Sequence, residues 1–462
     1  MTGRDVDSAL LSPVWAGSGA PLSDEAWLAA LLEAEVALVA AQAELGVVPE
    51  SAARVIASVA ASVRLDVVDI ALRSRETANP VVALVHDLTA AVAEVDPAAA
   101  DHVHRGGTSQ DILDSAAMLL AARTLHRVDA DLVECARALA GLAEEHRGTV
   151  LAGRTLAQHA VPITFGLKAA GWLAGVLDAS DRVRRTAAEL PAQLGGAAGT
   201  LAGYEEYAGE RGHGVRLARH FAARLGLRAP DLPWHSRRTP LLDLGWALTA
   251  VTGALGKIAL DVQVLSRTEI GELAEPAADG RGGSSAMPQK RNPVLATLLV
   301  SAARTVPAQA LVLGQAMLAE DERAPGTWHS EWQPLREALR TAAGAARTAV
   351  TLLDGLEVFP ARMRANLELT GGAIVAERVT AALAPRLGKA GAKALLGRLT
   401  REAAASGRPF AELLREVPEL DRDAAQDLLD PAHYLGAADD LVDRVLARYR
   451  EHGRGGPPDR PQ

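Results

Sequence analysis

The residues whose types are best suited to catalysis or ligand binding lie together in the range Gly282–Val294. Glycines and serines at the start of this stretch favour an open backbone, and Pro288 interrupts any helix there. Ser284 and Ser285 supply hydroxyl groups, and Lys290 gives the far end a positive charge. Hydroxyl groups, free backbone N–H groups and a cation together suit an anionic ligand. On composition alone, a Gly/Ser-rich connection between two helices is the alternative.

A second polar turn spans His102–Asp111 and leads into an amphipathic helix predicted for residues 112–146. Thr108 and Ser109 stand just before that helix, where hydroxyl and N–H groups form a ready site for an anion. An N-cap followed by a solvated turn explains the same residues without a ligand. The turn holds two histidines, but no third possible ligand is nearby in sequence, so no metal site is expected.

A third polar stretch, Gly153–Gly166, precedes another long helix that is predicted to begin near Thr164. His159 in this stretch is a candidate general acid or base, and a purely structural histidine is the alternative. Gly-rich segments at 193–200 and 253–257 lack the spacing of dinucleotide-binding and phosphate-binding loops. No nucleotide cofactor is therefore expected.

Bulk properties exclude several classes of protein. The chain has 462 residues, which is long for one domain and predicts two or three. A net charge of −9 and a pI near 5.8 argue against nucleic-acid binding, which needs clustered Lys and Arg. The single cysteine, Cys135, excludes a disulfide within the chain and fits a cytoplasmic location. Neither a signal peptide nor an uncharged apolar run of ~18 residues is visible, so no membrane span is expected.

Long helices are expected to position the three polar stretches. Ser23 is the predicted N-cap of a helix over residues 22–45, and the pair at 79–80, Asn-Pro, predicts a break between shorter helices. Later helices are predicted to end near Glu272 and to run over 294–318. No convincing alternating β pattern is present. Helices about 45 Å long with Ala and Leu stripes predict a bundle, including bundling between subunits.

The residues from Gly283 to Pro293 read G-S-S-x-M-P-x-K-x-N-P, which resembles the signature loop of the fumarase/aspartase superfamily. This pattern is long and specific, so it favours a catalytic loop over a linker. The other two polar turns fall where this superfamily has its other signature regions. Within the superfamily, the chain is most similar to the 3-carboxy-cis,cis-muconate cycloisomerase branch. The segments that carry this finer likeness are Gly153–Thr155, Thr164–Lys168, Pro233–His235, Glu322-Arg323 and Trp328–Trp332.

The resemblance implies an all-α, three-domain fumarase/aspartase-like fold with a central long-helix bundle. The expected domains are an N-terminal helical domain (1–105), the central bundle (106–352), a C-terminal helical domain (353–450) and a disordered tail (451–462). A catalytic loop is expected at 274–293 within the bundle. The resemblance also implies a homotetramer whose active sites each draw on three subunits, with neither a metal nor an organic cofactor.

The resemblance further implies proton abstraction next to a carboxylate of a small di- or tricarboxylate substrate. Ser284 is the expected base, poised as an alkoxide by loop N–H groups and by the cation of Lys290. Arg237 has a surface ion pair as its alternative explanation. The residues expected to bind substrate are His104, Thr108, Ser109, Arg154, Thr155, Gln158, Arg237, Ser285, Met287, Asn292 and Arg323.

The chain departs from the wider superfamily at one informative position. Many members read T-H-x-Q in the second region, with the histidine as general acid, whereas this chain has Leu156 after Thr155. Leucine cannot donate a proton, and His159, three residues on, is expected near the same face if the stretch is helical. A basic leaving group needs protonation as it departs, so a weakly basic leaving group is expected.

Two substrates satisfy this expectation. The first is 3-carboxy-cis,cis-muconate, which would make the chain a cycloisomerase of aromatic (protocatechuate) degradation. The alternative is nitrosuccinate, from which a lyase of secondary metabolism would release nitrite and fumarate. An adenylosuccinate-lyase-like enzyme and a non-catalytic helical scaffold are further alternatives. The intact Ser284, Lys290 and Asn292 argue against the scaffold.

Overall fold

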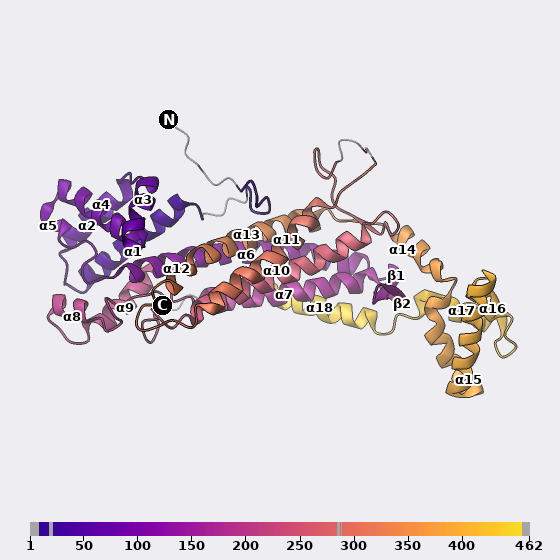
Figure 1. The fold of residues 1–462 in the computed structure, drawn as a ribbon. Helices are drawn as coiled ribbons and strands as arrows, with labels where there is room; N and C mark the ends of the chain where they lie inside the picture. The colour runs from indigo at the N-terminus through magenta and orange to yellow at the C-terminus, as the bar shows by residue number, and fades with distance from the viewer. Residues whose placement is uncertain (1–8, 18–21, 284–286, 288, 455–462) are drawn as a thin grey trace. The chain divides into compact units, whose positions relative to one another are not determined.

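The computed structural model describes residues 9–17, 22–283, 287 and 289–454. It confirms the expected all-α class, since helices dominate the described residues and strands are few and short (Figure 1). The chain divides into two compact units. The first comprises Met1–Asp131, Ala179–Gly253 and Ser301–Arg347, and the second comprises Leu132–Asp178, Ala254–Val300 and Thr348–Gln462. The three-domain boundaries expected from the sequence stay a prediction.

The first unit begins with the helices that the capping residues predict. Ser23 accepts a hydrogen bond from the backbone N–H of Ala26 at 3.2 Å and so caps α1. The side chain of Asn79 caps α4, which begins at Pro80, so the predicted break is confirmed. The short helices of this unit are α1 (Asp24–Glu44), α2 (Glu50–Ser62), α3 (Val67–Thr77), α4 (Pro80–Val95), α5 (Pro97–Ala100), α8 (Ala202–Ala208), α9 (His213–Leu225) and α12 (Thr327–Ser330).

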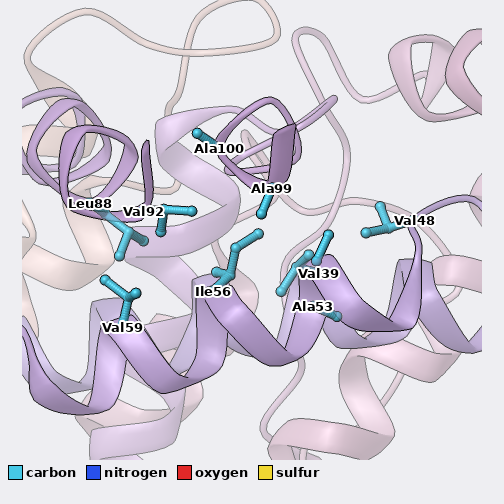
Figure 2. Packing of buried hydrophobic residues seen from close by; sticks show 10 residues of the cluster. Val39, Val48, Ala53, Ile56, Val59, Leu88, Val92, Ala99 and Ala100 are labelled. Atoms are coloured by element: carbon cyan, nitrogen blue, oxygen red, sulfur yellow. The ribbon is translucent and has the colours of Figure 1, made fainter. Parts of the chain in front are cut away.

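Small aliphatic side chains fill the core between these N-terminal helices. In Figure 2, Ile56 and Val59 of α2 point toward Leu88 and Val92 of α4. Val39 joins the same cluster from α1 and is only 2% exposed. Alanines and valines of this size let the helices approach closely, and the α1 segment becomes a fixed element of the unit.

Five helices from the predicted central region are long. They are α6 (Ser109–Glu145), α7 (Phe165–Glu189), α10 (Thr239–Leu265), α11 (Val294–Gln315) and α13 (Trp332–Asp354). Helix α10 ends at Leu265, before the expected Glu272, because a turn and the short strand β3 (Leu273–Ala274) follow it. By length and composition alone, α1, α10 and α11 could each cross a membrane. The expected absence of a span rested on the charged residues that interrupt each apolar run, and it stays a prediction.

Helices also form the C-terminal part of the second unit. Phe410 and Leu413 of α16 pack with Leu396 of α15 in one buried cluster. An ion pair between Arg448 and Asp178 at 2.8 Å ties the last helix to α7. The elements are α14 (Pro360–Leu367), η1 (Glu368–Thr370), η2 (Ala373–Val375), α15 (Ala376–Ser406), α16 (Phe410–Arg415), α17 (Arg422–Leu429), η3 (Pro431–His433) and α18 (Ala438–Arg454). Residues 455–462 of the predicted tail lie outside the described residues.

The expectation of no β-structure is wrong in the third polar stretch. Strands β1 (Val150–Thr155) and β2 (Gln158–Thr164) form an antiparallel hairpin, and β3 pairs with β4 (Glu357–Val358). The turn of the hairpin consists of Leu156 and Ala157, with φ of 47° and 64°. Two positive φ values make a type I′ turn, which usually carries Asn or Gly, so the sequence lacked the usual hairpin signal. The helical placement of His159 is therefore also wrong, because His159 lies in β2 opposite Arg154.

We expect Ala157→Gly to stabilise the protein by about 0.5–1 kcal/mol, because glycine adopts a positive φ without the steric cost that alanine meets. Urea unfolding of the variant beside the wild type would measure the difference. Ala160→Gly in β2 is the matched control, since Ala160 has no positive φ, and it should destabilise by about the same amount. Equal destabilisation by both changes would contradict a strained turn.

Candidate active site

The predicted catalytic loop is described only in part. Ser284 and Ser285 lie outside the described residues, so the base stays a prediction. Met287 is 43% exposed, and its carbonyl accepts a hydrogen bond from the backbone N–H of Lys290 at 3.0 Å. The side chain of Lys290 is exposed and forms no ion pair with a described residue. The ammonium group of Lys290 is therefore available for an anion.

The two ends of the loop are fastened by hydrogen bonds. The carboxylate of Glu275 accepts hydrogen bonds from the backbone N–H groups of Leu295 and Ala296, at 3.0 and 2.7 Å, and so caps α11. The backbone N–H of Asn292 donates to the carbonyl of Gly282 at 2.9 Å. Gly282 has φ +68°, and a Cβ at this position would lie 2.6 Å from the backbone carbonyl oxygen of Asn292. Only glycine fits where Gly282 contacts Asn292, and this contact joins the two ends of the loop.

The hairpin presents Thr155 and Gln158 beside its turn. These two residues are paired across the strands and are both exposed, so their side chains are free to meet a ligand. Leu156 occupies the first turn position with its side chain 99% exposed. It therefore places no proton donor at this turn. His159 is partly buried, and burial lowers the pKa of its imidazole, with Arg154 adding to the effect.

Arg154 was expected to bind substrate, but its guanidinium is engaged within the protein. It forms two hydrogen bonds with the fully buried carboxylate of Glu272, at 2.6 and 3.0 Å. The side-chain amide of Asn366 donates to the same carboxylate at 2.7 Å. The pair joins the hairpin to the segment that precedes the catalytic loop. Sequence reasoning missed Glu272 because it lies 118 residues from Arg154.

The second polar turn presents two hydroxyl groups. Thr108 and Ser109 are partly exposed, and neither hydroxyl forms a hydrogen bond with a described residue. The α6 helix begins at Ser109, so the N–H groups of its first turn follow these hydroxyls directly, and that of Asp111 donates to the carbonyl of Thr108 at 2.9 Å. His104 stands four residues earlier, with φ 54° and its Nδ1 2.6 Å from Oε1 of Glu35. This turn has the groups expected of a carboxylate-binding site.

Beneath this turn, the fully buried carboxylate of Asp111 organises the backbone. It accepts hydrogen bonds from the N–H groups of Gly195 and Gly196 at 2.8 and 2.9 Å. His235 Nε2 lies 2.9 Å from Oδ1 of Asp111, and the Tyr204 hydroxyl donates at 3.2 Å. The glycine-rich segment that matched no nucleotide motif thus has a structural role, because glycines let its backbone approach the carboxylate.

Arg238, rather than Arg237, belongs to the buried network. The Arg238 guanidinium lies between the carboxylates of Asp114, at 2.8 and 3.1 Å, and Glu331, at 2.6 and 2.9 Å. Its carbon Cζ stands 4.6 Å from the ring centroid of Trp234. Arg237 is exposed and borders a surface cavity of about 430 Å³, so nothing in the described structure connects it to the turn with Thr108.

Arg323 meets the same network from a different segment. Its Nε donates to Oε1 of Gln110 at 3.0 Å, and its Nη2 donates to the carbonyl of Ala197 at 3.1 Å. The amide of Gln110 in turn donates to the carbonyl of His235 at 2.9 Å. Arg323 therefore holds the glycine-rich segment and the start of α6 together, whether or not it also meets substrate.

Burial raises the pKa of Glu331 to about 7, with Asp114 adding repulsion and Arg238 opposing the rise. The folded protein thus binds this proton more tightly than an unfolded glutamate, whose pKa is near 4.5. The resulting stabilisation is complete at or below pH ~4.5 and is lost as the pH rises to about 7. Relative to Glu331→Gln, which cannot titrate, the wild type should lose up to about 3 kcal/mol of unfolding free energy over that interval. Parallel pH dependence of denaturant unfolding in the two proteins would contradict this assignment.

The predicted site residues divide between the two units of a chain. His104, Thr108, Ser109, Arg237 and Arg323 belong to the first unit. Arg154, Thr155, Gln158, Met287, Lys290 and Asn292 belong to the second. An active site assembled from several subunits stays a prediction. Among the described residues, no group of three or more His, Cys, Asp or Glu is placed to hold a metal ion.

Comparison with known protein families gives two matches. Residues 12–308 match a family described as lyase, and residues 372–445 match the adenylosuccinate lyase C-terminus. The chain is 60% identical over 449 residues to nitrosuccinate lyase of Streptomyces davaonensis, which covers 96% of this chain and 95% of that protein. It is 42% identical over 439 residues to 3-carboxy-cis,cis-muconate cycloisomerase of Pseudomonas aeruginosa, with 94% of each protein covered.

Solved structures give the same family. The 3-carboxy-cis,cis-muconate lactonizing enzyme from Pseudomonas putida matches with a TM-score of 0.89 at 36% identity, covering 96% of this chain and 100% of that one. A fumarate lyase from Mesorhizobium sp. BNC1 matches with a TM-score of 0.83 at 36% identity, covering 93% and 97%. The chain therefore belongs to the fumarase/aspartase superfamily and is a lyase-family enzyme.

Proposed function

We propose that this enzyme eliminates nitrite from nitrosuccinate and releases fumarate. The observation that carries the proposal is the 60% identity to nitrosuccinate lyase over 96% of the chain, against 42% to a muconate cycloisomerase. The sequence alone placed the cycloisomerase first, because several of its segments, among them Gly153–Thr155 and Pro233–His235, resemble that branch. The higher identity to nitrosuccinate lyase favours nitrosuccinate over 3-carboxymuconate as the substrate.

The hairpin turn supports a leaving group of low basicity. Leu156 stands at the turn where the resemblance implies a histidine acid in many members of the wider superfamily, and its side chain cannot donate a proton. Nitrite departs as a stable anion and needs no proton as the bond breaks. Ammonia and hydroxide are strongly basic, and their departure depends on such a donor.

The proposed reaction removes a proton and an anion from neighbouring carbons. Ser284 as alkoxide takes the proton from C3, next to one carboxylate, and the electron pair forms the C2–C3 double bond. The C2–N bond breaks, and its electrons leave with nitrite. Lys290 stabilises the negative charge that develops on the carboxylate next to C3, and Thr108, Ser109, Gln158 and Asn292 bind the two carboxylates. From the family resemblance, we propose that the working enzyme is a homotetramer with shared sites.

Lactonisation of 3-carboxy-cis,cis-muconate is the second candidate. The TM-score of 0.89 to a lactonizing enzyme favours it, because the two folds differ little. The leaving or attacking group in that reaction is a carboxylate, which is also weakly basic. The absence of a donor at Leu156 therefore does not separate the two substrates.

Purified protein incubated with each substrate separates them. We expect nitrosuccinate to yield nitrite and fumarate in equal amounts, and 3-carboxymuconate to show an absorbance change at least a hundredfold slower, since one pocket rarely serves both skeletons equally. Nitrite would be measured colorimetrically and fumarate by its ultraviolet absorbance. Fast lactone formation without nitrite release would overturn the proposal.

A further inference from the structure

Glu35 is a buried carboxylate outside every motif that the sequence singled out. It lies in the middle of α1 and is only 3% exposed. Its one hydrogen-bonding partner among the described residues is His104, whose Nδ1 lies 2.6 Å from Oε1. A buried carboxylate with a single partner is costly to retain, so its position calls for a role beyond packing.

The His104 ring is held in one orientation by its surroundings. Its backbone is in the left-handed region, at φ 54°, which is unusual for a residue with a side chain. Gly107 lies against the ring, and a Cβ there would approach the His104 Cε1 to 3.1 Å. The amide of Gln42, also on α1, donates to the carbonyl of Arg105 at 2.9 Å and fixes the same turn. Helix α1 therefore both orients the His104 ring and places a carboxylate beside it.

The other ring nitrogen is available to a ligand. Nδ1 lies 2.6 Å from Oε1 of Glu35, where a carboxylate would accept its proton, while Nε2 forms no hydrogen bond with a described residue. The imidazole stands in the same turn as the hydroxyl groups of Thr108 and Ser109. A doubly protonated ring would present an N–H donor and a positive charge beside them.

The charged groups that act on His104 are the carboxylates of Glu35 and Asp111. Glu35 faces it from α1 and Asp111 from α6, and Tyr204, from α8, lies within reach of both carboxylates. Burial opposes the charged imidazole, but Glu35 and then Asp111 outweigh this effect and raise the pKa of His104. The charged form thus persists above the ordinary imidazole value of about 6.5. It is lost only as the pH rises through the raised value.

We propose that Glu35 is a positioning residue that converts His104 into a cationic receptor for one carboxylate of the substrate. Glu35 holds the Nδ1 proton, and the Nε2–H of His104 donates to the substrate together with Thr108 and Ser109. The identity of the anion rests on the proposed function, whereas the Glu35–His104 pairing does not. The dyad adds positive charge beside the hydroxyl groups of Thr108 and Ser109, whereas the guanidinium of Arg105, in the same turn, donates to the carbonyl of Asp101.

The first test needs no substrate. Diethyl pyrocarbonate acylates only neutral imidazole, so the rate of His104 modification against pH, followed by peptide mass spectrometry, reports its titration. In the wild type we expect half-maximal reactivity above pH 6.5, and in Glu35→Gln a midpoint lower by about one unit. Glu33→Gln is the matched control, because Glu33 lies on the same helix but is exposed and paired with Arg123 at 2.8 Å. A wild-type midpoint at or below 6.5 would overturn the proposal even if Glu35→Gln did not fold.

The second test uses turnover of nitrosuccinate. Glu35→Gln should raise KM about tenfold at pH 8, where its His104 is neutral, with kcat changed less than threefold, and the difference should shrink near pH 6. Glu35→Asp, which keeps the charge, should restore part of the loss, and Glu33→Gln should match the wild type. An unchanged KM in folded Glu35→Gln would overturn the role of Glu35. Failure of the wild type itself to release nitrite would instead overturn the proposed substrate and leave the acylation result to decide the dyad.

Discussion

Replacing Ser284 with alanine is expected to lower kcat on nitrosuccinate by about 10²–10⁴-fold. The carbon acid next to a carboxylate is very weak, so turnover depends on a strong base placed beside it. Alanine keeps the size of the loop residue but cannot accept a proton. Since Ser284 adds little to binding in the ground state, KM should change less than threefold. Steady-state nitrite release with matched protein concentrations measures both constants.

Ser285→Ala is the matched control for this prediction. Ser285 is the neighbouring hydroxyl in the same motif and is proposed to bind substrate rather than to take the proton. We expect its loss to raise KM several-fold while kcat stays within about tenfold of the wild type, as for one hydrogen bond to an anion. Retention of kcat in Ser284→Ala, or an equal collapse of kcat in both variants, would show that the base is another group.

Arg238→Met is expected to destabilise the protein by about 3–5 kcal/mol. Arg238 is 1% exposed, and its removal leaves the carboxyl groups of Asp114 and Glu331 buried together without a cation. Methionine fills much of the same volume, so the loss reports on charge rather than on a cavity. Denaturant unfolding followed by circular dichroism at pH 7 measures the change.

Arg237→Met provides the control within the same turn. Arg237 is exposed and forms no ion pair with a described residue, so its replacement should change stability by no more than about 0.5 kcal/mol. Equal effects of the two substitutions would mean that the turn, and not the ion pairs of Arg238, determines the loss. The contrast also tests which of the two adjacent arginines belongs to the network under the Thr108 turn.

The sequence predicted the elements that depend on local signals. Ser23 and the Asn79-Pro80 pair marked helix ends correctly, because capping and proline chemistry act over a few residues. The start of α7 at Phe165 agrees with the helix expected near Thr164. The hairpin was missed because Leu156 and Ala157 adopt positive φ without the Asn or Gly that usually reveals such a turn.

The groups that support the site were beyond sequence reasoning for a different reason. Glu35 lies 69 residues from His104, and Asp114 lies 124 residues from Arg238. No local pattern links such partners, because only the packing of helices brings them together. The motif residues themselves, such as Thr108 and Lys290, were predicted because the family pattern covers them, and their roles stay predictions. The buried carboxylates of Glu35 and Asp114 carry no motif of their own.

In the proposed reaction a serine base acts without a partner acid, so the leaving group must depart unprotonated. Fumarate formation from nitrosuccinate, aspartate and malate tests this directly, since the three share one carbon skeleton and differ in the group expelled. We predict rapid fumarate formation from nitrosuccinate and rates at least 10³-fold lower from the two substrates that lose a basic group, in line with the contribution of a general acid. Fumarate formation from aspartate or malate within tenfold of the rate from nitrosuccinate would contradict it.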